Sequence, residues 1–263
     1  MLEAVEQAAT EEGYTILVGS TEGSAKAVPK YAEMLPRRIV DGMISISSLH
    51  PSLHEWIRGS VSVYPLVTAL SFDSSLPVSS VGIDEYGCSF DAMGHLYNLG
   101  HRRVAVIAGP LSASMMPERL RGVHAQAKAQ GLLDTLRVEH GIFGFSHGFE
   151  AAARLLSTPD RPTAIYCMSD TLAIGASDCA RRLGFNLPAD LSVVGFGDID
   201  VARYLTPSLT TIAVPLREIG REAVRMLVDI LEKRHESPRI KTLPHRLTIR
   251  DSAKPPPAII KVV

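Results

Sequence analysis

The sequence has little of several features that mark particular classes of protein. It contains only three cysteines, Cys88, Cys167 and Cys179. They form no C-x-x-C pair, and their odd number argues against a disulfide framework. No apolar run approaches the roughly 18 residues that a membrane span requires, and the N-terminal stretch MLEAVEQAATEEGY lacks the regions of a secretory signal. These absences predict a reducing, cytoplasmic location and no membrane partner.

Excess charge of one sign and phosphate-binding loops are also missing. The net charge is −1, so the chain has no basic field of the kind that a DNA-binding surface needs, and we expect it to bind nucleic acid poorly by itself. VGSTEGS (18–24) and VGFGDID (194–200) follow predicted strands without the G-x-G-x-x-G order. His50 and His54 lie four residues apart, but no third ligand is nearby. No cofactor and no metal site are therefore predicted.

What is present is a regular alternation of strand-like and helix-like segments. Short apolar runs are predicted as strands over 14–20, 42–47, 64–71, 103–109, 163–169, 191–196 and 209–214. Amphipathic stretches are predicted as helices at the N-terminus up to Gly13 and over 91–101, 116–131, 149–157, 170–184 and 215–234. Continuous apolar runs are typical of strands covered on both faces, as in parallel sheets. The order predicts a doubly wound α/β fold, and the number of strands favours two sheets with a ligand crevice between them.

The stretch GFSHG (144–148) fits G-x-S-x-G, the turn that presents the nucleophilic serine of lipases and esterases. A helix follows it, but the preceding RVEHGIF carries charge and a glycine and is not a continuous apolar run. No HGGG-type oxyanion segment comes before it. A polar loop entering a helix, with Ser146 or His147 near its start, is the preferred interpretation, and a serine hydrolase using Ser146 is kept as an alternative.

Arg119 is a candidate ligand-binding residue. It follows the predicted strand RVAVIAG and the loop GPLSASM, and so it belongs to the first turn of a helix at the carboxyl end of a sheet. A guanidinium there opposes the helix dipole, but it can hold a hydroxyl pair or a carboxylate with two hydrogen bonds. Arg121, two residues on, is expected to be merely solvated.

Several long segments, in order, resemble the effector-sensing domain of the LacI/GalR family of transcription regulators. They are YNLGHRRVAVIAGP (97–110), RLRGVHAQAKAQG (119–131), GFEAAARLLS (148–157), PTAIYCMSDTLAIGA (162–176), LPADLSVVGFGDIDVARYLTPSLTTIAVPLREIGREAV (187–224) and LPHRLTIRDS (243–252). The resemblance implies a type-I periplasmic-binding-protein fold, in which two Rossmann-like subdomains are joined by three crossovers. The N-terminal subdomain would comprise 1–82 and 215–243, and the C-terminal subdomain 83–214 and 244–263.

The resemblance also implies the site. Arg119 matches the arginine that grips the effector, and Phe143 matches the aromatic residue that packs on it. Ser169 takes the place of an asparagine, and Asp170 would cap or brace the following helix. Asp84 and Asp198 are expected at the cleft, while Ile174 and Tyr204 resemble dimer contacts. The implied function is effector sensing and dimerisation in a repressor, with no catalysis.

The chain departs from the family pattern in ways that carry expectations. Gly197 stands where the family has an aspartate that accepts hydrogen bonds from the effector, which predicts a preference for a sugar acid over a neutral sugar. No helix-turn-helix is present, so operator DNA would be bound only through a module outside this sequence. The chain begins inside the family's first helix, which predicts a sheet without its first strand. A solute-binding protein of a sugar transporter, which shares the fold, is the remaining alternative.

Overall fold

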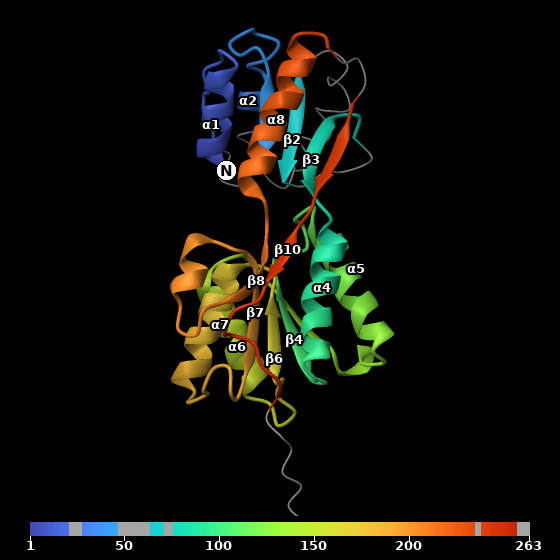
Figure 1. The fold of residues 1–263 in the computed structure, drawn as a ribbon, viewed down its shortest axis with the longest axis vertical. Coiled ribbons are helices and arrows are strands. Elements are labelled where there is room, and N and C mark those ends of the chain that lie inside the picture. The colour runs from blue at the N-terminus through green and yellow to red at the C-terminus, as the bar shows by residue number, and fades with distance from the viewer. Residues whose placement is uncertain (21–27, 47–63, 71–75, 235–237, 257–263) are drawn as a thin grey trace, which may run out of the picture. The chain divides into compact units, whose positions relative to one another are not determined.

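The computed structural model describes all residues except 21–27, 47–63, 71–75, 235–237 and 257–263 (Figure 1). His50 and His54 lie outside the described residues. The chain forms two compact units. The N-terminal unit comprises Met1–Asp84 and Pro215–Pro244, and the C-terminal unit comprises Glu85–Val214 and His245–Val263. Each unit is therefore built from two separate parts of the chain.

The N-terminal unit is a parallel sheet with helices packed on it. Its elements are α1 (Leu2–Glu11), α2 (Val28–Ala32), β1 (Met43–Ile46), β2 (Leu66–Leu70), β3 (Ser79–Ile83), α8 (Leu216–Leu231) and β9 (Ile240–Leu243), with strand order β1-β2-β3-β9. Helix α1 packs on α8 because apolar residues recur on facing stripes of the two helices. Val5, Ala8 and Ala9 of α1 meet Val224 and Val228 of α8 in one buried cluster.

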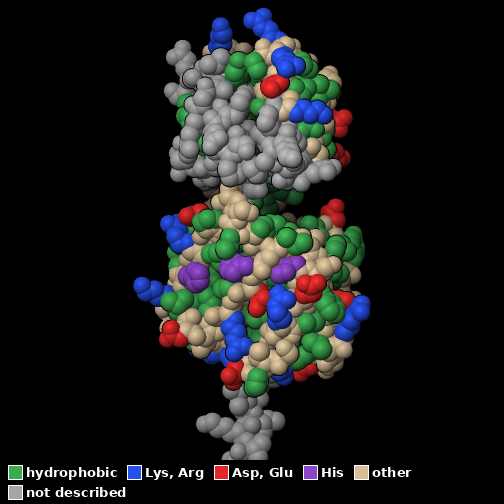
Figure 2. All heavy atoms as spheres, turned by 180° about the vertical axis from the view of Figure 1, so that it is seen from behind, with side chains coloured by type: hydrophobic (Ala, Val, Ile, Leu, Met, Phe, Trp, Pro, Cys, Tyr) green, Lys and Arg blue, Asp and Glu red, His purple; other side chains and the backbone are tan. Residues whose placement is uncertain are grey.

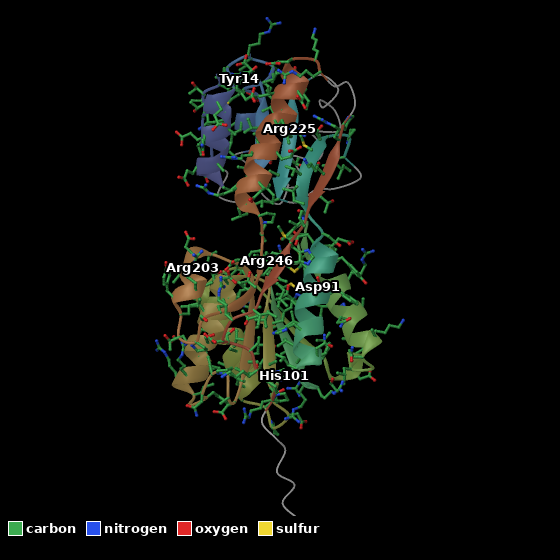
Figure 3. All side chains as sticks on the ribbon, viewed as in Figure 1. Tyr14, Asp91, His101, Arg203, Arg225 and Arg246 are labelled. Atoms are coloured by element: carbon green, nitrogen blue, oxygen red, sulfur yellow. The ribbon has the colours of Figure 1, made fainter. Side chains whose placement is uncertain are left out.

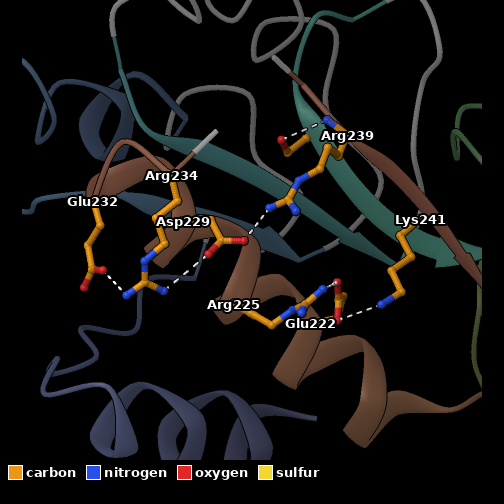
Figure 4. Close-up of polar contacts among 8 residues, drawn as sticks. Glu222, Arg225, Asp229, Glu232, Arg234, Arg239 and Lys241 are labelled. Carbon is orange, nitrogen blue, oxygen red and sulfur yellow. Dashed lines mark hydrogen bonds and ion pairs between the residues drawn. The ribbon is translucent and has the colours of Figure 1, made fainter. Parts of the chain in front are cut away.

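Ion pairs join α8 to β9 in this unit (Figure 4). Asp229 of α8 accepts a hydrogen bond from Arg239 at 2.6 Å, and Glu222 is 2.9 Å from Lys241. Both carboxylates are largely buried, so these pairs are less screened by solvent than surface pairs. The bond from Arg239 holds the pKa of Asp229 below its usual value. The edge strand β9, which exposes Ile240, is thereby tied to the helix that covers the sheet.

The C-terminal unit is a larger sheet between two layers of helices (Figure 1). Its elements are α4 (Glu85–Asn98), β4 (Val104–Ala108), α5 (Met116–Ala129), η1 (Leu133–Thr135), β5 (Arg137–His140), α6 (Phe145–Leu156), β6 (Ala164–Cys167), α7 (Asp170–Arg182), β7 (Ser192–Gly197), η2 (Asp200–Tyr204), β8 (Thr210–Ala213) and β10 (Arg246–Thr248). The strand order is β10-β8-β7-β6-β4-β5. Only β10 runs antiparallel to its neighbour. Every residue of β4 and β6 is buried, as expected for strands covered on both faces.

The two parallel sheets confirm the predicted fold class, with local differences. YTILVGS (14–20) was predicted as a strand, but it is irregular and exposes Leu17 and Val18. A strand exists only when it is hydrogen-bonded to a neighbour, and the described sheet offers this segment none. RVEH forms the edge strand β5, although its charged residues had argued against a buried strand. None of the helices described is both long and apolar enough to cross a bilayer.

The segment after β10 is fastened to the amino ends of the strands. The buried His101 imidazole lies 2.9 Å from the carbonyl oxygen of Lys254 through Nε2 and 2.8 Å from the Thr163 hydroxyl through Nδ1. A carbonyl only accepts hydrogen bonds, so Nε2 carries the proton and the threonine donates to Nδ1. Ser192 bonds both the amide and the carbonyl of Lys254. Figure 3 marks His101 at this end of the unit.

This arrangement predicts that acid weakens the fold below pH 6.5. Burial lowers the pKa of His101, although the bond to Lys254 opposes the shift. The unfolded chain therefore binds a proton first, and stability is complete above the unfolded value of about 6.5 and falls below it. The slope is at most about 1.4 kcal/mol per pH unit for one group. Urea unfolding at pH 7.5 and 5.5 should show a smaller difference for His101→Gln than for the control His124→Gln, an exposed residue. An unchanged difference in His101→Gln contradicts the assignment.

Candidate functional site

Arg119 lies at the carboxyl ends of the strands of the C-terminal unit. It stands in the first turns of α5 and its side chain is buried. Its Nε donates to Glu85 Oε2 at 2.7 Å, and its Nη1 donates to the carbonyl oxygen of Met168 at 2.9 Å. The guanidinium carbon is 3.6 Å from the ring centre of Phe196. Met168 follows β6 and Phe196 belongs to β7, so the guanidinium is held rigidly over this edge of the sheet.

The ion pair between Arg119 and Glu85 determines the net charge around the guanidinium. Both side chains are about nine-tenths buried, at 8% and 10% exposed. A buried carboxylate beside a guanidinium balances its charge. Arg119 therefore offers directed N–H groups at this edge, while its positive charge is already compensated within the unit.

Phe143 lies on the neighbouring strand exit. A methyl group added to Gly109, the residue after β4, would collide with the Phe143 ring. The ring therefore packs directly on the backbone that leaves β4, and only glycine permits this approach. Phe143 remains 40% exposed. It is an aromatic surface, free on one side, at the same sheet edge as Arg119.

Gly197 ends β7 and Asp198 follows it, and both have positive φ, at 129° and 55°. For the non-glycine Asp198 this is an unusual backbone conformation. Its carboxylate accepts a hydrogen bond from Arg250 Nη2 at 2.7 Å, and both side chains of this pair are mostly buried. Asp198 is thus a second balanced charge near the strand ends.

Ser169 and Asp170 start α7 directly after β6. The Ser169 hydroxyl accepts a hydrogen bond from the Leu172 amide at 3.1 Å, so it caps the helix. Asp170 accepts hydrogen bonds from Thr211 at 2.6 Å and from the Ile199 amide at 2.9 Å. Burial raises the pKa of Asp170, against the effect of these bonds. Asp170 braces the helix start against β7 and β8, and Ser169 remains half-buried at the sheet edge.

Other predicted residues lie elsewhere. Asp84 is exposed and is the last residue of the N-terminal unit before Glu85. Ile174 is half-buried on α7, and Tyr204 ends η2 with 77% of its surface exposed.

Ser146 is the second residue of α6, whose cap is Gly144, and it is exposed. It does not occupy the strand-to-helix turn that a nucleophilic serine requires, so the hydrolase alternative fails on geometry.

Sequence reasoning missed the partners that hold these residues. Glu85, Phe196 and Arg250 surround Arg119 and Asp198, yet none was singled out. An acidic residue at a helix start is favoured by the helix dipole in any protein, so Glu85 carried no distinct signal. Phe196 has the sequence context of an ordinary core residue in its strand. Arg250 is 52 positions from Asp198 along the chain.

The surface of the C-terminal unit shows mixed charge (Figure 2). Acidic and basic side chains alternate over the face shown, and histidines lie in a row across it. Within the described ranges, no group of three His, Cys, Asp or Glu side chains could hold a metal ion. Arg119 and Phe143 thus place fixed N–H donors and an exposed aromatic ring at one edge of this sheet.

Comparison with known proteins gives the class. Residues 93–253 match the periplasmic binding protein-like domain family. The chain is 34% identical over 255 residues to the HTH-type transcriptional repressor CytR of Escherichia coli strain K12. The aligned region covers 97% of this chain and 74% of CytR. Two solved structures share the fold. The transcriptional regulator CelR–cellobiose complex has a TM-score of 0.85 at 29% identity, over 95% of this chain and 77% of that chain. A dimeric Lac repressor has a TM-score of 0.88 at 25% identity, over 97% and 93%.

Fold and site therefore define a periplasmic-binding-protein-like sensing domain. The chain belongs to the LacI/GalR family of transcription regulators, as its effector-binding domain. Its relatives are transcriptional repressors, and the chain is a regulator rather than an enzyme. This finding also speaks against the alternative of a transporter's solute-binding protein.

Proposed function

We propose that this domain senses a small sugar-like molecule, which binds at the carboxyl ends of β4, β6 and β7. Arg119 donates to hydroxyl oxygens, and Phe143 packs on the apolar face of the sugar ring. Ser169, Gly197, Asp198 and Asp84 are the further residues assigned to the ligand. The observation that carries the proposal is the buried Arg119 guanidinium, held by Glu85, Met168 and Phe196 at the sheet edge that also carries the exposed Phe143 ring.

The charges favour a neutral effector. The absence of an aspartate at Gly197 predicted a preference for a sugar acid. That prediction rested on the loss of a hydrogen-bond acceptor and of a repulsive charge at this position, whereas the ion pairs show that Glu85 balances Arg119 and Arg250 balances Asp198. An effector carboxylate would gain no free positive charge and would lose its hydration. The cellobiose named for the CelR complex, a neutral sugar, is consistent with this choice.

The regulatory role follows from differential binding. An effector that binds one arrangement of the two units more tightly than another shifts their populations by that difference in affinity. We propose that the domain acts as a cytoplasmic homodimer, with Ile174 and Tyr204 at the contact, and that the shift changes how a helix-turn-helix module outside this sequence sits on operator DNA. Similarity to a dimeric Lac repressor supports the dimer.

A thermal-shift screen tests the effector class. Neutral sugars should raise the melting temperature more than their uronic acids, and calorimetric titration of galactose against galacturonate is a suitable matched pair. Phe143→Ala should weaken binding of the best sugar about two- to twelvefold, since an aromatic contact contributes about 0.5–1.5 kcal/mol beyond its buried area. Tyr204→Ala should leave that affinity unchanged. Tighter binding of the acid contradicts the neutral class, and an unaffected Phe143→Ala contradicts the site.

A further inference from the structure

A pocket of about 360 Å³ lies on the C-terminal unit where α4, α5 and β10 meet. That volume is far above the roughly 30 Å³ share of one water molecule and falls in the range of small-ligand pockets, about 300–1,000 Å³. Asp91 (labelled on α4 in Figure 3), His95 and Asn98 line it from α4, and Gln126 lines it from α5. It shares no residue with the candidate effector site.

The pocket holds polar groups without hydrogen-bond partners. His95 Nε2 is buried and unpaired. Among the described residues, the carboxamides of Gln126 and of the exposed Asn98 make no hydrogen bond to the protein and are open to the pocket. Buried polar atoms in proteins are nearly always hydrogen-bonded, and leaving one unpaired is unfavourable. A buried imidazole nitrogen without a partner, beside two carboxamides that line the same pocket, indicates that a polar ligand can supply hydrogen bonds there.

The chemistry of these groups selects a neutral ligand. Burial lowers the pKa of His95, so its imidazole is uncharged at pH 7 and has one N–H donor and one lone pair. Each carboxamide likewise offers a donor and an acceptor. The one carboxylate, Asp91, is already engaged by His245 Nε2 at 3.0 Å. The free groups therefore match a molecule that presents a donor beside an acceptor and carries no charge.

The remaining walls select a flat ligand. Phe90 of α4 and Leu247 of β10 supply apolar surface, and the Phe90 ring is fixed by stacking on Tyr86 at 5.9 Å between centroids. Gly94 allows the Gln126 carboxamide to lie close to α4, since a methyl group there would be 2.9 Å from its Nε2. A lining that combines an aromatic ring with carboxamides accommodates a planar molecule with one polar edge.

We propose that this pocket is a second small-molecule site, which takes a neutral planar amide with an N–H beside a C=O. The ring of the ligand lies against Phe90 and Leu247, and its amide edge pairs with His95, Asn98 and Gln126. Leu247 belongs to the strand that follows the passage from Pro244 in one unit to His245 in the other. A ligand here therefore contacts the strand that begins just after one of the points where the chain passes from one unit to the other.

Titration calorimetry with nicotinamide tests the proposal on the full chain. Nicotinamide should bind, and nicotinate, which has the same shape but an anionic edge, should bind at least tenfold more weakly. Gln126→Leu and the exposed Asn98→Ala should each weaken nicotinamide binding about fivefold or more, as expected for one lost hydrogen bond, with melting temperatures close to that of the parent. Phe143→Ala, in the effector site, should have no effect. In NMR spectra, the imidazole nitrogens of His95 should shift as nicotinamide is added.

Three results would overturn the site. One is absence of nicotinamide binding at millimolar concentration. Another is binding that neither Gln126→Leu nor Asn98→Ala changes while both variants remain folded. The last is binding that Phe143→Ala abolishes, which would place nicotinamide in the effector site instead. Each of these outcomes is independent of whether a sugar binds at Arg119.

Discussion

Replacing Arg119 by alanine is expected to abolish detectable sugar binding and to destabilise the domain. Loss of charged hydrogen bonds to an effector removes about 1.5–3 kcal/mol, a factor of roughly 10 to 150 in affinity. The same change leaves the Glu85 carboxylate, 10% exposed, without its cation, and breaking a buried pair from one side removes about 3–5 kcal/mol of stability. Calorimetry with the best sugar of the screen and urea unfolding measure the two effects.

A second variant separates binding from folding. In Arg119→Met with Glu85→Gln, the pair is replaced by uncharged side chains of similar size, and such replacements of buried pairs are often neutral. This double variant should regain most of the lost stability and still fail to bind the sugar. A double variant that binds as tightly as the parent chain would remove Arg119 from the site. One as unstable as Arg119→Ala would show that the unpaired carboxylate is not the cause of the instability.

Replacing Gly175 by alanine is expected to destabilise the C-terminal unit by up to about 2 kcal/mol. A methyl group at Gly175 of α7 would collide with the backbone carbonyl of Phe145 in α6, and the Phe149 amide is 3.0 Å away. Backbone cannot turn aside as a side chain does, so the two helices must separate, at a cost of about 1–3 kcal/mol or more. The gain of about 1 kcal/mol in helix propensity offsets only part of this.

Gly94→Ala is the matched control for this prediction. Gly94 also lies inside a helix that packs on another helix, but its new methyl group would meet only the side-chain amide of Gln126 at 2.9 Å. That amide can rotate away, so the change in unfolding free energy should stay within about 1 kcal/mol. Equal effects of the two substitutions would mean that the approach of α6 to α7 does not depend on Gly175.

The buried strands were predictable because their signal is local. Every residue of Val104–Ala108 is apolar and buried, and such a run indicates a covered parallel strand without knowledge of its neighbours. Edge strands carry no such local signal in the sequence. Ile240–Leu243 alternates exposed and half-buried residues over only four positions, and Arg137–His140 carries three polar side chains. Their strand state comes from pairing with Ser80–Ile83 and Ala105–Ala108, which no local pattern reports.

The same distinction applies to the site. Arg119 could be predicted because a helix start after a buried strand defines its place in the fold. Its charge balance could not, because it depends on Glu85, 34 positions away. Asp198 was expected as a carboxylate near the ligand, but its state depends on Arg250. Position follows from the order of elements, whereas the electrostatic state follows from contacts between segments that are distant in the sequence.

The attachment of the final segment has a consequence for how the domain is synthesised. In the C-terminal unit, β10 completes the pairing of β8, and Ser252 bonds the Val193 carbonyl and the Thr210 amide. A nascent chain that has not yet reached residue 254 lacks these partners, even though the rest of that unit was translated long before. Since domains generally fold as units during translation, a ribosome stalled between 214 and 245 would hold a C-terminal unit with an open sheet edge. A fusion of this domain to another DNA-binding module must therefore include both parts of the C-terminal unit, Glu85–Val214 and His245–Val263.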